Sequence, residues 1–176
     1  MPKWLQTGMI VTAFSWPAPG QITSVYTPLS GPSCEIIKQD AETGSTVHAC
    51  PGVGGIKVQV AFDDGRMSIT LISRTGESWP LDFWNLVTRS FSSIGEQAEW
   101  RMNRRSGKGE PVALIVRVHE PSQVRAKARS YLTVTKVTHR EACIVNIIPA
   151  SPEANRRARQ SADLSQDQAC LTARRD

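Results

Sequence analysis

The sequence predicts a mainly β, α+β fold: an antiparallel sheet or barrel with one or two packed helices, held by two disulfides. Three observations support this prediction. Apolar and polar residues alternate with a period of two over much of the chain. An Asp-Gly turn separates two of these alternating segments, and four cysteines are widely spaced. With 176 residues, 40% of them hydrophobic and 21% charged, the chain has the length and composition of one globular domain with a core.

The N-terminal segment has the pattern of a secretory signal. Lys3 is the only charge before residue 35, and a short apolar run follows it at residues 9–16. Small residues then lead to Gly20, where cleavage is expected. We therefore predict a signal peptide over residues 1–20, followed by a single disulfide-linked β-rich domain over residues 21–176 that is periplasmic or secreted. The alternative is a frayed N-terminal extension of a cytosolic protein.

The clearest hairpin lies in the middle of the chain. Residues 56–62 alternate, with Ile and Val on one face and polar side chains on the other. Asp63-Asp64-Gly65 follows, and Asp-Gly accepts the positive φ angles that tight hairpin turns need. Residues 67–71 then continue the alternation as the second strand.

Further strands are predicted on both sides of this hairpin. Residues 112–118 are apolar for most of their length, which is typical of a strand buried on both faces. Residues 131–137 and 142–148 are joined by a short connection, so we expect them to pair antiparallel. Shorter strands are predicted at three further places: residues 34–38, 46–50 and 97–102.

Two segments have helical periodicity. Asp82 is placed to cap the first, and its apolar residues recur every three to four positions: Phe83, Val87, Phe91 and Ile94. Ser151-Pro152 is a favourable start for the second. That helix carries a stripe of small residues expected to press on a sheet: Ala154, Ala158 and Ala162. Its exposed side carries arginines: Arg156, Arg157 and Arg159.

The cysteines are expected to form two disulfides. They are Cys34, Cys50, Cys143 and Cys170, and the absence of any C-x-x-C pair argues against zinc and thioredoxin-like chemistry. Three connectivities are open. We favour Cys34–Cys50 with Cys143–Cys170, because each pair is adjacent in sequence and joins a predicted strand to the segment after it. Disulfides persist in oxidising compartments, which agrees with the predicted export.

No catalytic apparatus, metal or cofactor is predicted, so we expect the protein not to be an enzyme. The three histidines, His48, His119 and His139, have no helical i, i+4 spacing, and an exposed histidine at a strand end needs no functional explanation. A metal or acid–base site would require the fold to bring His119 or His139 to carboxylates. The sequence has no G-x-S-x-G motif, and paired cysteines leave no thiol nucleophile.

Trp100 and Arg101, together with Arg66 and Trp84, form the predicted binding site. An exposed tryptophan next to an arginine is the residue chemistry of binding hot spots. The prediction requires Trp100 to be exposed, and the alternative is that the tryptophan rings fill the core.

We expect the partner to be an envelope protein or an anionic surface polymer, since 21 basic and 16 acidic residues give a net charge of +5. No nucleic-acid partner is expected, because the basic clusters lack interleaved aromatic residues, and no segment has the length of a transmembrane helix. The sequence does not indicate the oligomeric state.

The chain resembles a family of exported (periplasmic) bacterial proteins that has no assigned function. The matching segments follow one another in order: residues 24–27, Cys34, Cys50-Pro51-Gly52 with Gly54-Gly55, residues 66–68, 99–101 and 132–136, Cys143, residues 158–163 and Cys170. This resemblance implies export and two disulfides and brings no known active site.

A fainter likeness is to the periplasmic lysozyme inhibitors. Residues 50–71 have a similar order of Cys, alternating strand, Asp-rich turn and strand, but the Ser-Gly-rich inhibitory loop of those proteins is not visible here. A net charge of +5 would also repel cationic lysozymes at long range. We therefore predict an exported non-enzymatic envelope binding protein, with an inhibitor of a cell-wall hydrolase as the alternative.

Overall fold

A computed structural model describes residues 22–104, 109–122 and 127–173 of the chain. The predicted signal peptide, residues 1–20, lies outside the described residues. Within the described residues, no helix has the length and apolar character needed to cross a membrane.

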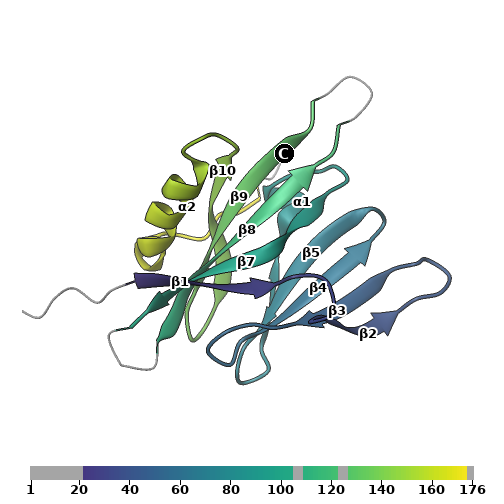
Figure 1. Ribbon diagram of the computed structural model, residues 1–176, viewed down its shortest axis with the longest axis horizontal. Coiled ribbons are helices and arrows are strands. Elements are labelled where there is room, and N and C mark those ends of the chain that lie inside the picture. The colour runs from purple at the N-terminus through teal and green to yellow at the C-terminus, as the bar shows by residue number, and fades with distance from the viewer. Residues whose placement is uncertain (1–21, 105–108, 123–126, 174–176) are drawn as a thin grey trace, which may run out of the picture.

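Two five-stranded antiparallel sheets pack face to face, and helix α2 covers the outer face of one of them (Figure 1). Sheet A has the order β1 (Ile22–Pro28), β7 (Ser93–Asn103), β8 (Glu110–Glu120), β9 (Arg129–Val137) and β10 (Ala142–Pro149). Sheet B has the order β2 (Glu35–Gln39), β3 (Thr46–Cys50), β4 (Lys57–Asp63), β5 (Arg66–Ile72) and β6 (Ser78–Leu81). The mainly β prediction is confirmed in its sheet form, since the described strands close no barrel.

The predicted hairpin forms β4 and β5. Val60 pairs with Ile69 and Val58 with Leu71, and all four side chains lie in the core between the sheets. Asp64 and Gly65 take φ angles of 47° and 70° in the turn, as expected for an Asp-Gly hairpin.

Sheet A is buried on both faces. In β8, Leu114 and Val116 face the core between the sheets, whereas Ala113 and Ile115 lie in a second core beneath α2. This two-sided burial explains the nearly continuous apolar run of β8 in the sequence and confirms that prediction. β9 and β10 pair antiparallel, also as predicted.

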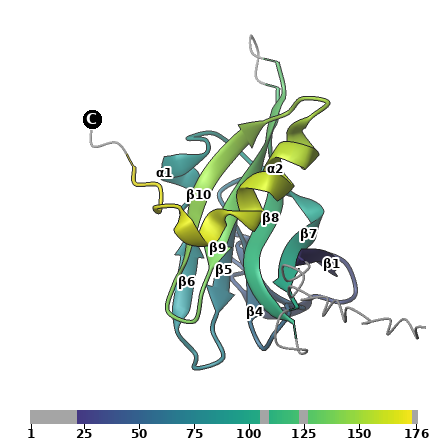
Figure 2. The same cartoon turned by 90° about the vertical axis from the view of Figure 1, so that its left-hand side faces the viewer.

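The second predicted helix is α2 (Ala154–Asp163), and its alanine stripe packs on sheet A. Ala154, Ala158 and Ala162 are buried in the core that the helix shares with β8, β9 and β10. Figure 2 shows α2 lying across β8 and β9. Small side chains let the helix approach the sheet closely, while the predicted arginines remain on the exposed side. A short 3₁₀ turn, η1 (Ser165–Asp167), follows the helix.

The first predicted helix is much shorter than expected. Asp82 caps α1 (Phe83–Leu86) as predicted, since its Oδ1 accepts a hydrogen bond of 3.1 Å from the backbone N–H of Asn85. The helix does not extend to Ile94, so that prediction is wrong. Ile94 lies in β7, opposite Val118 of β8, because pairing along sheet A satisfies its backbone. The helix-like spacing of apolar residues over 83–94 does not come from one helix. Phe83 in α1 and Ile94 in β7 pack against the same core from two different elements.

Strands β1 and β6 were not predicted. β1 forms the edge of sheet A by pairing antiparallel with β7. The two strands are far apart in sequence: Thr27 and Trp100, whose side chains form a hydrogen bond, are separated by 73 residues. Sheet A therefore consists of the first strand and the last four, and all of sheet B is inserted between them.

Both disulfides have the predicted connectivity. Cys34 is bonded to Cys50 across a separation of 16 residues, and Cys143 is bonded to Cys170 across 27 residues. The second bond ties the segment after η1 to β10, where the backbone N–H of Leu171 also donates to the carbonyl of Ile144 at 2.8 Å.

Removing Cys143–Cys170 should destabilise the fold more than removing Cys34–Cys50. In the chain-entropy model, the longer loop contributes about 3.5 kcal/mol and the shorter one about 3 kcal/mol to the free energy of unfolding. Urea unfolding of C143S/C170S and C34S/C50S, each against the wild type, measures both contributions. Unfolding midpoints that match the wild type would contradict a stabilising role for the bonds.

Candidate functional site

The four predicted binding residues lie in two different places. Trp100 and Arg101 are on β7 in the interior, and Arg66 and Trp84 meet at the surface near the β4–β5 turn. The structure therefore does not form the predicted four-residue site.

The prediction that Trp100 is exposed is wrong. Its side chain is 0% exposed and lies in the core between the sheets with Ala98 and Met102. Its indole N–H donates a hydrogen bond of 2.9 Å to the hydroxyl of Thr27 on β1. The ring is thus fully buried and its one polar group is satisfied, as expected for a core tryptophan.

Arg101 is also buried, on the opposite face of β7. Its Nε and Nη2 donate to the two carboxylate oxygens of Asp163 in α2, at 2.7 and 2.9 Å, and its Nη1 donates to the hydroxyl of Ser24. Only 8% of the residue is exposed. A paired arginine in this position fixes α2 to the sheet and is not available to a ligand.

Glu99 completes this contact from the same face of β7. Arg159 of α2 donates to both of its carboxylate oxygens, at 2.7 and 3.2 Å, and the Ser24 hydroxyl donates to one of them. Burial alone would raise the pKa of Glu99, but the hydrogen bonds from Arg159 and Ser24 and the nearby charges of Arg159 and Arg101 outweigh it and hold that pKa below its ordinary value. The hydrogen bond to Glu99 in turn raises the pKa of Arg159. We call Glu99, Arg101, Arg159 and Asp163 the α2 clasp.

Arg66 and Trp84 form an exposed cation–π pair. The guanidinium carbon of Arg66 lies 4.3 Å from the centroid of the Trp84 ring, and Trp84 is 41% exposed. The carboxylate of Asp64 also pairs with Arg66. Such a contact contributes about 0.5–1 kcal/mol at an exposed site, which favours the stacked arrangement of the ring and the guanidinium.

A second exposed ring lies beside this pair. Phe91 is 55% exposed and packs against the hairpin turn, where a Cβ added to Gly65 would lie 2.7 Å from the ring. The backbone N–H of Ser92 donates to the carbonyl of Gly65 at 3.1 Å, which fixes Phe91 next to the start of β5. We call Arg66, Trp84 and Phe91 the Arg66–Trp84 surface.

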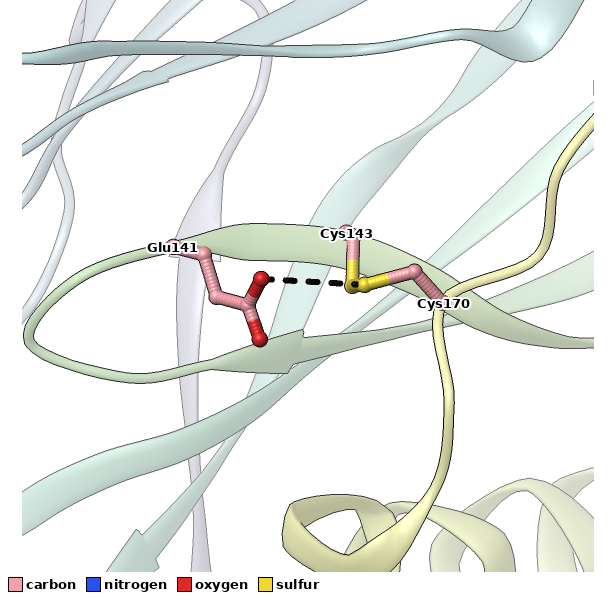
Figure 3. A group of neighbouring side chains, drawn as sticks. All are labelled: Glu141, Cys143 and Cys170. Carbon is pink, nitrogen blue, oxygen red and sulfur yellow. Dashed lines mark hydrogen bonds between the residues drawn. A yellow bond between two sulfur atoms is a disulfide. The ribbon is translucent and has the colours of Figure 1, made fainter.

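One group of possible metal ligands lies at the second disulfide. Figure 3 shows the carboxylate of Glu141 beside Cys143 and Cys170, with an oxygen 3.9 Å from Cys170 Sγ. The two sulfurs are bonded to each other and are not thiolates in this form. The carboxylate is also paired with Lys136 Nζ at 2.8 Å. The arrangement is a disulfide with a neighbouring ion pair, and it does not require a metal ion.

The fold keeps the histidines apart. His48 lies in sheet B, where its Nε2 is 3.2 Å from the hydroxyl of Thr46. His119 lies near the end of β8 and His139 just after the end of β9. Because β8 and β9 are antiparallel, these two histidines are at opposite ends of sheet A. An acid–base site containing both is therefore not formed, but His139 Nε2 lies 3.9 Å from a carboxylate oxygen of Glu110, so the fold does bring one of the two histidines to a carboxylate.

A cleft lies between the two sheets at the end where β5 ends and β8 begins. Its volume is about 520 Å³, within the range of small-molecule sites. Side chains from both sheets and from η1 line this end cleft, chiefly Arg74, Trp79, Glu110, His139 and Gln166. Sequence reasoning did not assign it, because its residues come from separate elements and share no spacing. The one available signal was Trp79, an aromatic residue beside a turn.

Comparisons with known proteins add no relative: no protein-family model, curated protein sequence or solved structure matches the chain. The resemblances to an exported family and to lysozyme inhibitors remain predictions from the sequence.

Replacing Glu99 with Gln should weaken the α2 clasp and flatten the dependence of stability on pH. The folded-state pKa of Glu99 is below the ordinary value of 4.5, so its ionised form stabilises the fold at neutral pH. This contribution is lost as pH falls through the folded-state pKa. We expect E99Q to lower the free energy of unfolding at pH 7 by about 1.5–3 kcal/mol, the range for a lost hydrogen bond to a charged group.

Urea unfolding at pH 7 and at pH 3 measures both effects. E96Q is the matched control, because Glu96 is an exposed carboxylate on the same strand. Equal losses of stability in E99Q and E96Q would show that the clasp contributes nothing specific.

Proposed function

We propose that the protein is an exported, non-enzymatic binding protein of the bacterial envelope, periplasmic or secreted, that recognises a protein partner through the Arg66–Trp84 surface. The two disulfides support export, because such bonds persist in an oxidising compartment. No free cysteine is present among the described residues.

The observation that carries the proposal is the exposed, pre-positioned pair of Arg66 and Trp84. Tryptophan and arginine are among the residues most enriched at binding hot spots, and tryptophan covers a large area with few rotatable bonds. Stacking on the ring fixes the guanidinium, and the turn at Gly65 fixes Phe91 beside it. A surface ordered before binding loses less entropy when the partner arrives.

A protein fits this surface better than an anionic polymer. Asp64 neutralises part of the charge of Arg66, so the surface lacks the run of unpaired cations that a polyanion requires. Trp84 and Phe91 offer apolar area instead, which is typical of the centre of a protein interface. Binding of a purified anionic polymer through Arg66 would overturn this choice of partner.

A cell-wall hydrolase remains the alternative partner. Inhibition can be tested directly, by measuring lysozyme turnover with the purified protein in micromolar excess. Unchanged turnover would end the hydrolase-inhibitor alternative for that enzyme and would leave binding to other envelope proteins to be tested.

Export predicts a processed and fully oxidised chain. We expect the intact mass from a bacterial host to correspond to a chain beginning at Gln21, with no alkylation until a reductant is added. An unprocessed chain with four alkylated thiols would contradict export.

Replacing Trp84 or Arg66 with Ala should weaken binding to an envelope partner about thirtyfold, the effect of a 2 kcal/mol hot-spot residue. The partner would first be identified by cross-linking in an envelope extract and then purified, so that its affinity can be measured by biolayer interferometry. R157A and L164A are the controls, since Arg157 is exposed on α2 and Leu164 is exposed just after it. Equal affinities for all four variants would exclude the Arg66–Trp84 surface as the binding site.

A further inference from the structure

We infer that the end cleft is a separate binding site for a small carboxylate that also carries hydrogen-bond donors and a flat apolar face. It lies at the opposite end of sheet B from the Arg66–Trp84 surface, because Arg66 begins β5 and the cleft opens where β5 ends. The inference thus does not depend on the protein partner proposed above.

The cleft is built by segments that the fold holds firmly. The β5–β6 turn supplies Arg74, β6 supplies Trp79, the start of β8 supplies Glu110, and η1 supplies Gln166. In the β5–β6 turn, the backbone N–H of Gly76 donates to the carbonyl of Ser73 at 3.1 Å. A cavity of about 520 Å³ with both apolar and polar lining is typical of a small-molecule site.

Arg74 provides the cation of the site. Its side-chain stem lies against Gly55, where an added Cβ would be 2.5 Å from both Cγ and Cδ. Gly55 also has a φ angle of +81°, so a larger residue is excluded there for two reasons. Among the described residues, the guanidinium of Arg74 has no ion-pair or hydrogen-bond partner. A positioned guanidinium with free donors matches the two oxygens of a carboxylate.

Other polar groups of the cleft offer acceptors. Gln166 Nε2 donates to the carbonyls of Val112 and Val137, at 2.7 and 3.1 Å, which orients the amide and leaves its Oε1 to accept from a ligand. Glu110 and His139 approach each other only to 3.9 Å, which is too long for a hydrogen bond, so both retain bonding capacity. A ligand that combines a carboxylate with hydroxyl or amide N–H donors would satisfy both sets of groups.

The hydroxyls of Ser73 and Thr75 are less available. They lie 2.8 Å apart and bond to each other within the β5–β6 turn. The polar specificity of the cleft therefore rests on Arg74, Glu110, His139 and Gln166.

Trp79 supplies the apolar wall, together with Ile56 and Pro111. The ring is half-buried and belongs to the same face of β6 as the buried Leu81. A flat ring of this size favours a ligand with an apolar face, such as a sugar or a peptide side chain. A carboxylated sugar and a peptide C-terminus share the required chemistry, and the probes below distinguish them.

The test uses the indole N–H signal of Trp79 in ¹H–¹⁵N spectra of the full chain, assigned with W79F. Glucuronate and N-acetyl-Ala-Ala are the carboxylate probes, and glucose and N-acetyl-Ala-Ala-amide are their uncharged counterparts. We expect one carboxylate probe to shift the Trp79 signal with a dissociation constant of about 1 mM or lower, and its uncharged counterpart to bind at least about tenfold more weakly. The probe that binds identifies the source of the carboxylate.

R74Q should weaken that binding at least about tenfold, whereas R157Q, which removes the same charge from α2, should leave it unchanged. Arg74 is exposed, so the thermal unfolding midpoints of both variants should match that of the wild type. No shift of Trp79 with either carboxylate at about 20 mM, or equal affinities of R74Q and R157Q, would overturn the inference.

Discussion

The structure depends on the burial of sheet A on both of its faces. Successive side chains of a strand point to opposite sides, so β8, β9 and β10 each contribute to two different cores. On β7, Trp100 enters the apolar core between the sheets, while its neighbours Glu99 and Arg101 face α2. Helix α2 must then supply the partners for these two charges, and it does so with Arg159 and Asp163.

This requirement gives α2 a defined position. The alanine stripe provides close apolar contact, but three small side chains alone offer little to fix where the helix lies along the sheet. The α2 clasp adds directional contacts at two points one turn apart. Burying charges is unfavourable in itself, so a network of this kind is tolerated because every charge has a hydrogen-bonded partner. We expect its main role to be the selection of one arrangement of helix and sheet.

Much of the fold could be predicted from the sequence, because local patterns reported local structure. The Asp-Gly turn identified the β4–β5 hairpin, the apolar run identified β8, and the order of the cysteines indicated their pairing. The helix expected up to Ile94 was wrong because a spacing of three to four residues cannot show that its members belong to two elements.

The predicted site failed for a related reason. Trp100 and Arg101 are adjacent within a predicted strand, and adjacent strand residues face opposite sides, so one surface could not have contained both. Only Arg66 and Trp84, which come from separate elements, meet as a pair. The end cleft had no sequence signal, because Arg74, Glu110 and Gln166 are brought together only by the packing of the two sheets.

The pairing of β1 with β7 also governs the order in which the chain can assemble. Sheet B is one continuous stretch of sequence from β2 to β6, and it can form from neighbouring segments. β1 has no partner strand until β7 is available, so a large part of the chain must be complete before sheet A can close. Long-range pairings of this kind slow folding. Under the export proposed above, the chain would cross a membrane unfolded, and the dependence of β1 on β7 would delay closure of sheet A until most of the chain has emerged.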